Sequence, residues 1–151
     1  MAKGESITIE AKHIFLDIVS YTHKRSVEAQ TDLIRILNDI VKTTIEETHL
    51  DANQYLFIPT GDGLCISIIN VSSPYDIHIK IALSILGKLG EYNSIEKDKM
   101  RQFDLRIGIN ENIDNLITDI NGEKNISGAG INIASRIESL CDNNQIIVGN
   151  S

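Results

Sequence analysis

The stretch YLFIPTGDG, residues 55–63, decides how the rest of this chain can fold. An apolar run ends at a proline, an acidic residue lies between two glycines, and a second apolar run follows at residues 64–71. Two short β-segments around an Asp-Gly pair predict a β-hairpin, because glycine reaches the backbone angles that such turns need. The hairpin would present the carboxylate of Asp62 at a rigid tip. Most turn aspartates are structural, so the rest of the chain has to decide whether this one is functional.

The composition is that of an ordinary globular protein, with 151 residues, 42% hydrophobic and 23% charged. This length predicts one domain over residues 1–151, with a core that needs no disulfides, and the two cysteines have no metal-ligand spacing. The sequence has no apolar segment of the roughly 20 residues that span a bilayer and no signal-peptide apolar region, so we expect a cytoplasmic protein without membrane contact. The net charge of -7 argues against nucleic acid as a partner but leaves open a single nucleotide bound with divalent metal.

The order of elements predicts an α+β fold. Period-2 and apolar runs predict strands at 6–19, 55–58, 64–71, 103–109, 116–120 and 145–148, and apolar repeats of three and four predict helices from about 20 to 48, 76 to 90 and 128 to 140. Residues 91–102 are expected to form a loop, and Asn121-Gly122 a tight turn. Helices alternating with single strands and strand pairs predict a sandwich in which the helices cover one face of a mainly antiparallel sheet.

Four polar positions stand out from their surroundings. Asp17 follows an apolar run, where a buried charge costs several kcal/mol unless it is paired or bound to metal; the alternative is an exposed strand end. Arg106 is either a functional residue in an apolar strand or the outward residue of an alternating one. Asn132 and Arg136 are four apart on one helix face, which is either functional or simply solvated.

Taken together, four motifs in order resemble the catalytic domain of class III nucleotidyl cyclases. They are FLDIVSYT at residues 15–22, TGDG at 60–63, LRIGIN at 105–110 and GxxINxASRIE at 128–138, and the resemblance covers residues 14–148. Ser20 stands where this family usually has glycine. The resemblance implies a ferredoxin-like, palm-like antiparallel sheet covered by helices.

The resemblance also implies a metal and phosphate site. In the family, two divalent ions, Mg²⁺ or Mn²⁺, serve the attack of the ribose 3′-hydroxyl on the α-phosphorus, and hard oxygen ligands suit such cations. By the same resemblance, the metal ligands are Asp17, Asp62 and the carbonyl of Ile18. The resemblance assigns Arg106 to bind the polyphosphate. It also assigns the backbone of the strand-to-helix junction to the phosphates, namely Val19, Ser20, Tyr21 and Thr22.

The resemblance assigns the remaining catalytic roles to the last helix. Asn132 would position the ribose, and Arg136 would stabilise charge at the α-phosphate in the transition state. In this family the aspartates and the asparagine-arginine pair of one site come from two domains. A single domain with both sets implies a head-to-tail homodimer with two equivalent sites, and an inactive monomer.

The chain departs from the family where the nucleobase is read. Three residues before the second motif's first glycine, family adenylyl cyclases have lysine and guanylyl cyclases glutamate, whereas this chain has Ile58. Three residues before the last motif's glycine, the family has aspartate, threonine or cysteine, whereas this chain has Asn125. Ile58 with a bulky neighbour such as Tyr55 or Phe57 would narrow the pocket for a smaller base, and the amide of Asn125 has both a donor and an acceptor for uracil or cytosine.

This pattern resembles the stand-alone pyrimidine cyclases of bacterial Pycsar antiphage systems, whose cyclic UMP or cyclic CMP activates an effector. We expect UTP to be favoured over CTP. The alternatives are an adenylyl or guanylyl cyclase that reads its base differently, a non-catalytic nucleotide-binding or dimerisation module, and a polymerase-like palm domain. Family domains also continue into a further strand pair with a phosphate-binding lysine, which this sequence is expected to lack.

Overall fold

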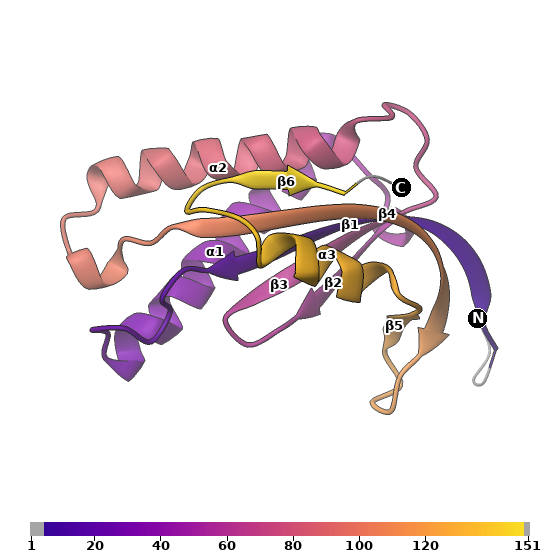
Figure 1. The fold of residues 1–151 in the computed structure, drawn as a ribbon, viewed down its shortest axis with the longest axis horizontal. Helices are drawn as coiled ribbons and strands as arrows, with labels where there is room; N and C mark the ends of the chain where they lie inside the picture. Colours follow the sequence, from indigo (N-terminus) through magenta and orange to yellow (C-terminus); the bar gives the residue numbers. More distant parts are fainter. Residues whose placement is uncertain (1–4, 150–151) are drawn as a thin grey trace.

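A computed structural model describes residues 5–149 and shows, for those residues, a curled sheet with three α-helices (Figure 1). The strands are β1 (Ile7–Ile18), β2 (Tyr55–Pro59), β3 (Gly63–Ile69), β4 (Leu105–Thr118), β5 (Lys124–Ser127) and β6 (Ile146–Val148). The helices are α1 (Val27–Thr48), α2 (Ile77–Ile95) and α3 (Gly130–Glu138), with short 3-10 turns at Ala52–Gln54 and Lys99–Arg101.

Strand β1 lies at the centre of the sheet. The strand order is β2-β3-β1-β4-β5, and all these neighbours are antiparallel, while β6 runs parallel to β4 at Ile107–Ile109. β1 pairs with β4 along its whole length and with β3 from Ala11 to Asp17. The predicted α+β fold with a mainly antiparallel sheet is confirmed, as is the hairpin of β2 and β3.

The two faces of the sheet are covered by different helices. Ile14, Leu16 and Ile18 of β1 are buried in one core cluster with residues of α1 and α2. The alternate side chains of β1 point to the opposite face, because side chains of a strand alternate. There α3 packs on β4 and β1, and in Figure 1 it lies in front of the strands while α1 lies behind them. The expectation that helices cover one face therefore holds for α1 and α2 but not for α3.

Several predicted boundaries were wrong. The strand expected at 116–120 is the continuation of β4, and the next strand is β5, after a turn in which the Asp119 N–H donates to the Glu123 carbonyl. The loop expected from residue 91 begins later, because α2 continues through two exposed glycines to Ile95. Tyr92 of this last turn packs on Phe103, with ring centroids 6.0 Å apart, which outweighs the low helix propensity of glycine. α1 starts at Val27 rather than after residue 22, since the Ser26 hydroxyl accepts from Ala29 N–H.

Within residues 5–149, none of the helices combines the length and the apolar composition needed to cross a membrane.

Gly108 lets α3 approach the sheet, and this generates the first prediction. A Cβ on Gly108 would lie 2.3 Å from the Ala134 carbonyl oxygen and 2.4 Å from the Glu138 nitrogen, so Gly108→Ala has to push α3 away. We expect it to lower the free energy of unfolding by about 2 kcal/mol or more in urea titrations. The matched control is Gly87→Ala, in open space on α2, which should raise stability by about 0.5–1 kcal/mol. Equal effects of the two substitutions would contradict this account.

Candidate functional site

The tip of the β2–β3 hairpin is held against the end of β1. Asp17 pairs in register with Gly63, and the Ile18 N–H donates to the Asp62 carbonyl at 3.0 Å. A Cβ on Gly63 would lie 1.9 Å from the Leu16 carbonyl oxygen, so only glycine allows this approach. Gly61 has a φ of +91°, which other residues rarely adopt. The turn therefore brings the exposed Asp62 beside the half-buried Asp17, as the two motifs predicted.

Two further side chains join this end of the sheet. Arg106 lies opposite Asp17 on β4, and its Nη2 donates to Asp17 Oδ2 at 3.2 Å. Its Nε lies 3.3 Å from Oε1 of Glu138, which reaches the same point from the buried face of α3. The guanidinium thus lies between two carboxylates of its own chain. Binding of a polyphosphate by Arg106 remains a prediction.

Two of the carboxylates at this point, Asp17 and Glu138, have raised pKa values. Burial raises the pKa of Asp17 to about 7, with Asp62 and then Glu138 adding to the effect. Burial also raises the pKa of Glu138, which its contacts with Asp17 and Arg106 only partly offset. Asp17 Oδ1 is buried without a hydrogen-bond partner in the described chain. A cation that pairs with this oxygen would remove the penalty for ionising Asp17.

These oxygen donors fit a divalent cation. Carboxylates and a backbone carbonyl are the ligands that Mg²⁺ and Mn²⁺ prefer, and a nucleotide site leaves the other coordination positions to phosphate and water. Among residues 5–149 there is no group of three or more His, Cys, Asp or Glu side chains arranged to hold a metal. The protein's share of such a site would therefore be two carboxylates, Asp17 and Asp62, with the carbonyl of Ile18.

The turn after β1 has unused backbone donors. The Val19 N–H donates to the Asp104 carbonyl, but the N–H groups of Ser20, Tyr21 and Thr22 donate to no acceptor within residues 5–149. Ser20 has a φ of 51°, which explains why glycine is usual at this position. Arg25 fixes the turn, since it donates to the Ser20 carbonyl at 2.6 Å and also to carbonyls of the 99–102 segment. The side chain of Tyr21 packs into the core, so only its backbone is available to a ligand.

Asn132 and Arg136 lie on the outer face of α3. Both are exposed, whereas Ala134 and Glu138 of the same helix are buried against the sheet. Neither side chain makes a hydrogen bond or ion pair with any part of the chain that the structure describes. The single chain thus brings Asp17, Asp62 and Arg106 together but leaves the asparagine-arginine pair outside this group.

The two predicted base-reading residues line one pocket. A pocket of about 610 Å³ lies between β2 and the β4–β5 hairpin, and its walls include Ile58, Asp119 and Asn125. Asn125 is oriented by its neighbours, because its Nδ2 donates to Asp119 Oδ2 at 3.4 Å and its Oδ1 accepts from the Ile126 N–H at 2.8 Å. Tyr55 does not line this pocket.

The placement of Tyr55 differs from the expected one. Its ring packs on Phe57, with centroids 5.3 Å apart, and both rings lie against the core cluster of the helix-covered face. The alternation of β2 puts Ile58 on the other face from these rings. Tyr55 therefore has no geometric basis for narrowing the pocket. Phe57 borders it, but a volume of about 610 Å³ is not narrow.

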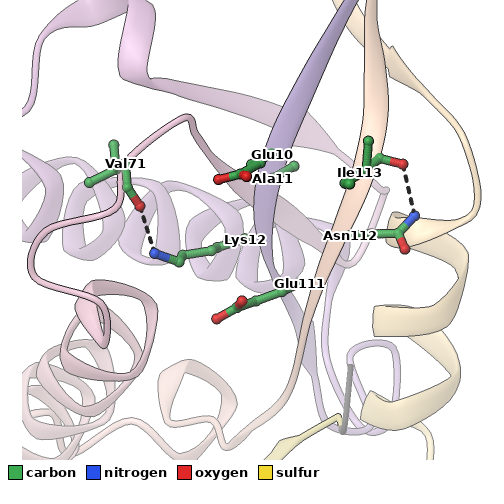
Figure 2. Close-up of a pocket in the computed structure, with 7 residues that line it drawn as sticks. All are labelled: Glu10, Ala11, Lys12, Val71, Glu111, Asn112 and Ile113. Carbon is green, nitrogen blue, oxygen red and sulfur yellow. Dashed lines mark hydrogen bonds between the residues drawn. The ribbon is translucent and has the colours of Figure 1, made fainter.

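A second pocket, of about 370 Å³, lies beside the middle of the β1–β4 pair, where Glu10 to Lys12 are paired with Glu111 to Ile113 (Figure 2). Its lining residues include Glu10, Lys12 and Glu111, and the Lys12 ammonium donates to the Val71 carbonyl at 2.6 Å. None of the predicted site residues lines it. This pocket is therefore separate from the site at the hairpin tip.

Glu138 and Asp119 are two polar residues of these sites for which the sequence patterns predicted no role. Glu138 is the fourth residue after Ala134, on the face of α3 that packs on Gly108, and a carboxylate at such a position signals a buried partner such as Arg106. Asp119 precedes Asn121-Gly122 and accepts the N–H groups of Asn121 and Glu123, an aspartate turn whose sequence pattern was visible. What the sequence did not show is that this turn faces β2.

Both the sequence and the fold of this chain are similar to those of known nucleotide cyclases. The family described as the adenylate and guanylate cyclase catalytic domain matches residues 3–151. No curated protein matches the chain. Among solved structures, the fold resembles a double mutant of the guanylyl cyclase domain of the RhoGC fusion protein from the aquatic fungus Blastocladiella emersonii, with a TM-score of 0.75, 17% identity, and coverage of 95% of this chain and 81% of that one.

Two other similar structures are an adenylyl cyclase and a guanylyl cyclase with converted specificity. A bacterial light-regulated adenylyl cyclase has a TM-score of 0.70 and 20% identity, over 89% of this chain and 71% of that one. The catalytic core of a rhodopsin-guanylyl cyclase with converted specificity, in complex with ATPalphaS, has a TM-score of 0.74 and 17% identity, over 95% of this chain and 79% of that one. At these identities the likeness supports the fold and leaves the substrate to the residues of this chain.

The raised pKa of Asp17 gives a prediction on stability. The folded chain holds the Asp17 proton to about pH 7, far above its ordinary value of 3.8, so the folded state binds more protons than the unfolded state between these values. Stability should therefore fall as pH rises from about 4 to 7. In metal-free urea titrations, Asp17→Asn should flatten this fall and be more stable than the wild type at pH 8. The exposed substitution Asp39→Asn on α1 is the control, and equal pH slopes for all three proteins would refute the assignment.

Proposed function

Because the chain belongs to the adenylate and guanylate cyclase catalytic domain family, we propose that it cyclises a pyrimidine nucleoside triphosphate, UTP in preference to CTP. The products would be the 3′,5′-cyclic monophosphate and pyrophosphate. The observation that carries this proposal is the pocket between β2 and β5, which Ile58 lines from β2 and Asn125 from β5, at the two positions where the family has residues that read purines.

The pocket's hydrogen-bonding groups suit uracil. With one bond already made by each end of its amide, Asn125 keeps one free N–H and one free oxygen lone pair, which match O4 and N3–H of uracil. The pocket also includes Lys124, which makes no ion pair within residues 5–149 and can donate to a carbonyl oxygen. Uracil has two carbonyl oxygens and cytosine has one, so a pocket with this additional donor favours UTP. Ile58 supplies apolar contact and no hydrogen bond.

The specificity cannot come from size alone. A pocket of about 610 Å³ has room for a purine, so the expected exclusion of larger bases by bulky neighbours has no support in this geometry. Discrimination would have to come from unmatched polar groups, which reject a base more strongly than loose apolar contact does. The large volume of this pocket is the observation that favours the second candidate function, an adenylyl or guanylyl cyclase.

In the proposed mechanism, the end of β1 positions the triphosphate. Asp17, Asp62 and the carbonyl of Ile18 would hold two divalent ions, which lower the pKa of the ribose 3′-hydroxyl and neutralise the triphosphate when bound. The free N–H groups of the turn at Ser20 would donate to β- and γ-phosphate oxygens. The 3′-oxygen would form a bond to the α-phosphorus while its proton passes to water. The bond between the α-phosphorus and the oxygen that bridges to the β-phosphate would break, and pyrophosphate would leave with that oxygen.

The transition state would be completed by a second copy of the chain. Asn132 and Arg136 are exposed on α3 and free of partners within the described chain, which suits residues that act across an interface. Arg136 of the facing copy would stabilise the negative charge that develops on the α-phosphate. A head-to-tail homodimer would have two such sites. Its cyclic nucleotide product would serve as an antiphage second messenger that activates an effector.

The substrate can be determined by incubating the protein with ATP, GTP, CTP and UTP, each with Mn²⁺, and identifying products by mass and retention time. We expect cyclic UMP as the main product, and no product from Asp62→Ala. Cyclic AMP or cyclic GMP as the main product would show that the purine alternative is right.

The base pocket can be tested by installing the family's adenine readers. Ile58→Lys together with Asn125→Asp should raise the ratio of ATP to UTP turnover roughly tenfold or more, because the pair places a donor and an acceptor for adenine in the pocket. The control is Leu56→Met, which changes the shape of the β2 side of this pocket without adding a charge. An unchanged ratio in the double variant would mean that the base binds elsewhere.

The shared site can be tested by mixing two inactive chains. Asp17→Ala and Arg136→Ala should each be inactive alone. In an equal mixture, half of the dimers would be hybrids with one intact site of two, so activity should recover to about a quarter of the wild-type value. Failure to recover, with mixed dimers demonstrated by mass spectrometry, would refute a site built from two chains.

A further inference from the structure

A buried hydrogen-bond network lies on the α3 side of the sheet, separate from the aspartates of the hairpin tip. His13 of β1 is fully buried, and its Nδ1 lies 2.7 Å from the Ser67 hydroxyl of β3. Its Nε2 lies 2.7 Å from Oδ2 of Asp114 on β4, which is 4% exposed. Three strands are therefore joined through one imidazole ring. The cyclase site proposed above uses none of these residues.

The hydrogen bond between His13 and Asp114 joins residues that are not opposite each other in the register of β1 and β4. His13 pairs in register with Asn110, whereas Asp114 is four residues further along the strand, a separation of roughly 13 Å in a flat sheet. Figure 1 shows β4 bending strongly over this part of its length. The short bond to the ring is thus possible only in the curled strand, and it links the curl to the position of β1.

Asp114 also holds the start of α3. Its Oδ1 accepts from the Gly130 N–H at 3.4 Å and from Asn112 Nδ2 at 2.7 Å. A Cβ on Gly128 would lie 2.2 Å from Asp114 Oδ1, and one on Gly130 would lie 2.2 Å from Oδ2. The two glycines at the entry of the helix therefore pack directly on the carboxylate. Asn132 follows Gly130 by two residues, so it lies in the turn of α3 that Asp114 contacts.

The protonation of the network is fixed by its partners. Burial lowers the pKa of His13, with the bond to Asp114 opposing this effect, so the ring is neutral. A neutral ring next to a carboxylate carries its proton on Nε2, and its Nδ1 then accepts from the Ser67 hydroxyl. Both buried donors of this network, the Ser67 hydroxyl and the Nε2–H of His13, then have an acceptor. Replacing one oxygen of Asp114 by an NH₂ group would leave at least one donor without an acceptor.

We propose that His13 and Asp114 are positioning residues for α3, which hold Asn132 and Arg136 in the orientation that the partner chain's nucleotide requires. This proposal rests on the proposed cyclase function for its effect on rate, and on the geometry alone for its effect on α3. The other anchor of the helix is the contact of Gly108 with Ala134 and Glu138. Loss of the Asp114 anchor would let the first turn of α3 move while the second anchor stays.

The test compares Asp114→Asn and His13→Gln with a matched control, His78→Gln. His78 is also a buried histidine, 3% exposed, with Nε2 3.0 Å from the carboxylate of Glu111, the residue shown in Figure 2, but it lies on α2. We expect the two network variants to lower kcat about 10- to 100-fold with KM for the nucleotide changed less than about threefold. The control should keep kcat within about twofold. Equal loss of kcat in the control and the network variants would overturn the proposal.

A second measurement is independent of activity. Amide hydrogen exchange in the peptide that covers α3 should be about tenfold faster in Asp114→Asn than in the wild type and unchanged in His78→Gln. If Asp114→Asn does not fold, Asn112→Ala removes one bond to the same carboxylate and should show a smaller change in the same direction. Unchanged exchange in α3 would overturn the proposal. If the wild type cyclises none of the four nucleotides, the proposed function fails, and the exchange result still decides whether Asp114 holds α3.

Discussion

The half-buried carboxylate of Asp17 is the constraint around which this structure is arranged. An acidic group at the end of a central strand has to be compensated, and three elements that are far apart in the sequence meet it there. The hairpin tip brings Asp62, β4 brings Arg106, and α3 brings Glu138. Only one of these neighbours is positively charged, so the cluster carries excess negative charge. That excess makes it a better place for a cation than for a closed structural ion pair.

The approach of these elements depends on missing side chains. Gly63 allows the hairpin to lie against β1, and Gly108 allows α3 to lie against β4, each at distances that a single methyl group would prevent. Large apolar side chains fill the opposite face of the sheet, under α1 and α2. One face therefore supplies stability through burial, and the other supplies close backbone contacts and polar groups. Residues of the same strand serve both purposes because their side chains alternate.

The sequence allowed the fold class and the hairpin to be predicted from local patterns, whereas the grouping of Asp17 with Asp62 was predicted from the resemblance of two motifs to the cyclase family. Other features depended on contacts between distant segments. The strands predicted at 103–109 and 116–120 left Asn112 and Asp114 outside any strand, but both lie in the continuous strand β4, where Asp114 bonds to His13 and to Asn112. The glycines of α2 suggested an early end to the helix, which packing of Tyr92 prevents. Tyr55 was expected near the base as a bulky neighbour of Ile58, but a separation of three residues along β2 puts the two side chains on opposite faces of the sheet.

The outward position of Asn132 and Arg136 has a consequence for how output would scale in the cell. If a working site needs one copy of the chain for its aspartates and another for this pair, the number of sites rises with the square of protein concentration while the chains are mostly monomeric. Doubling expression would then give up to about four times as much messenger. Such a protein would have little activity at low concentration, and its activity would rise steeply as the chains form dimers. A threshold of this kind would need no separate inhibitor.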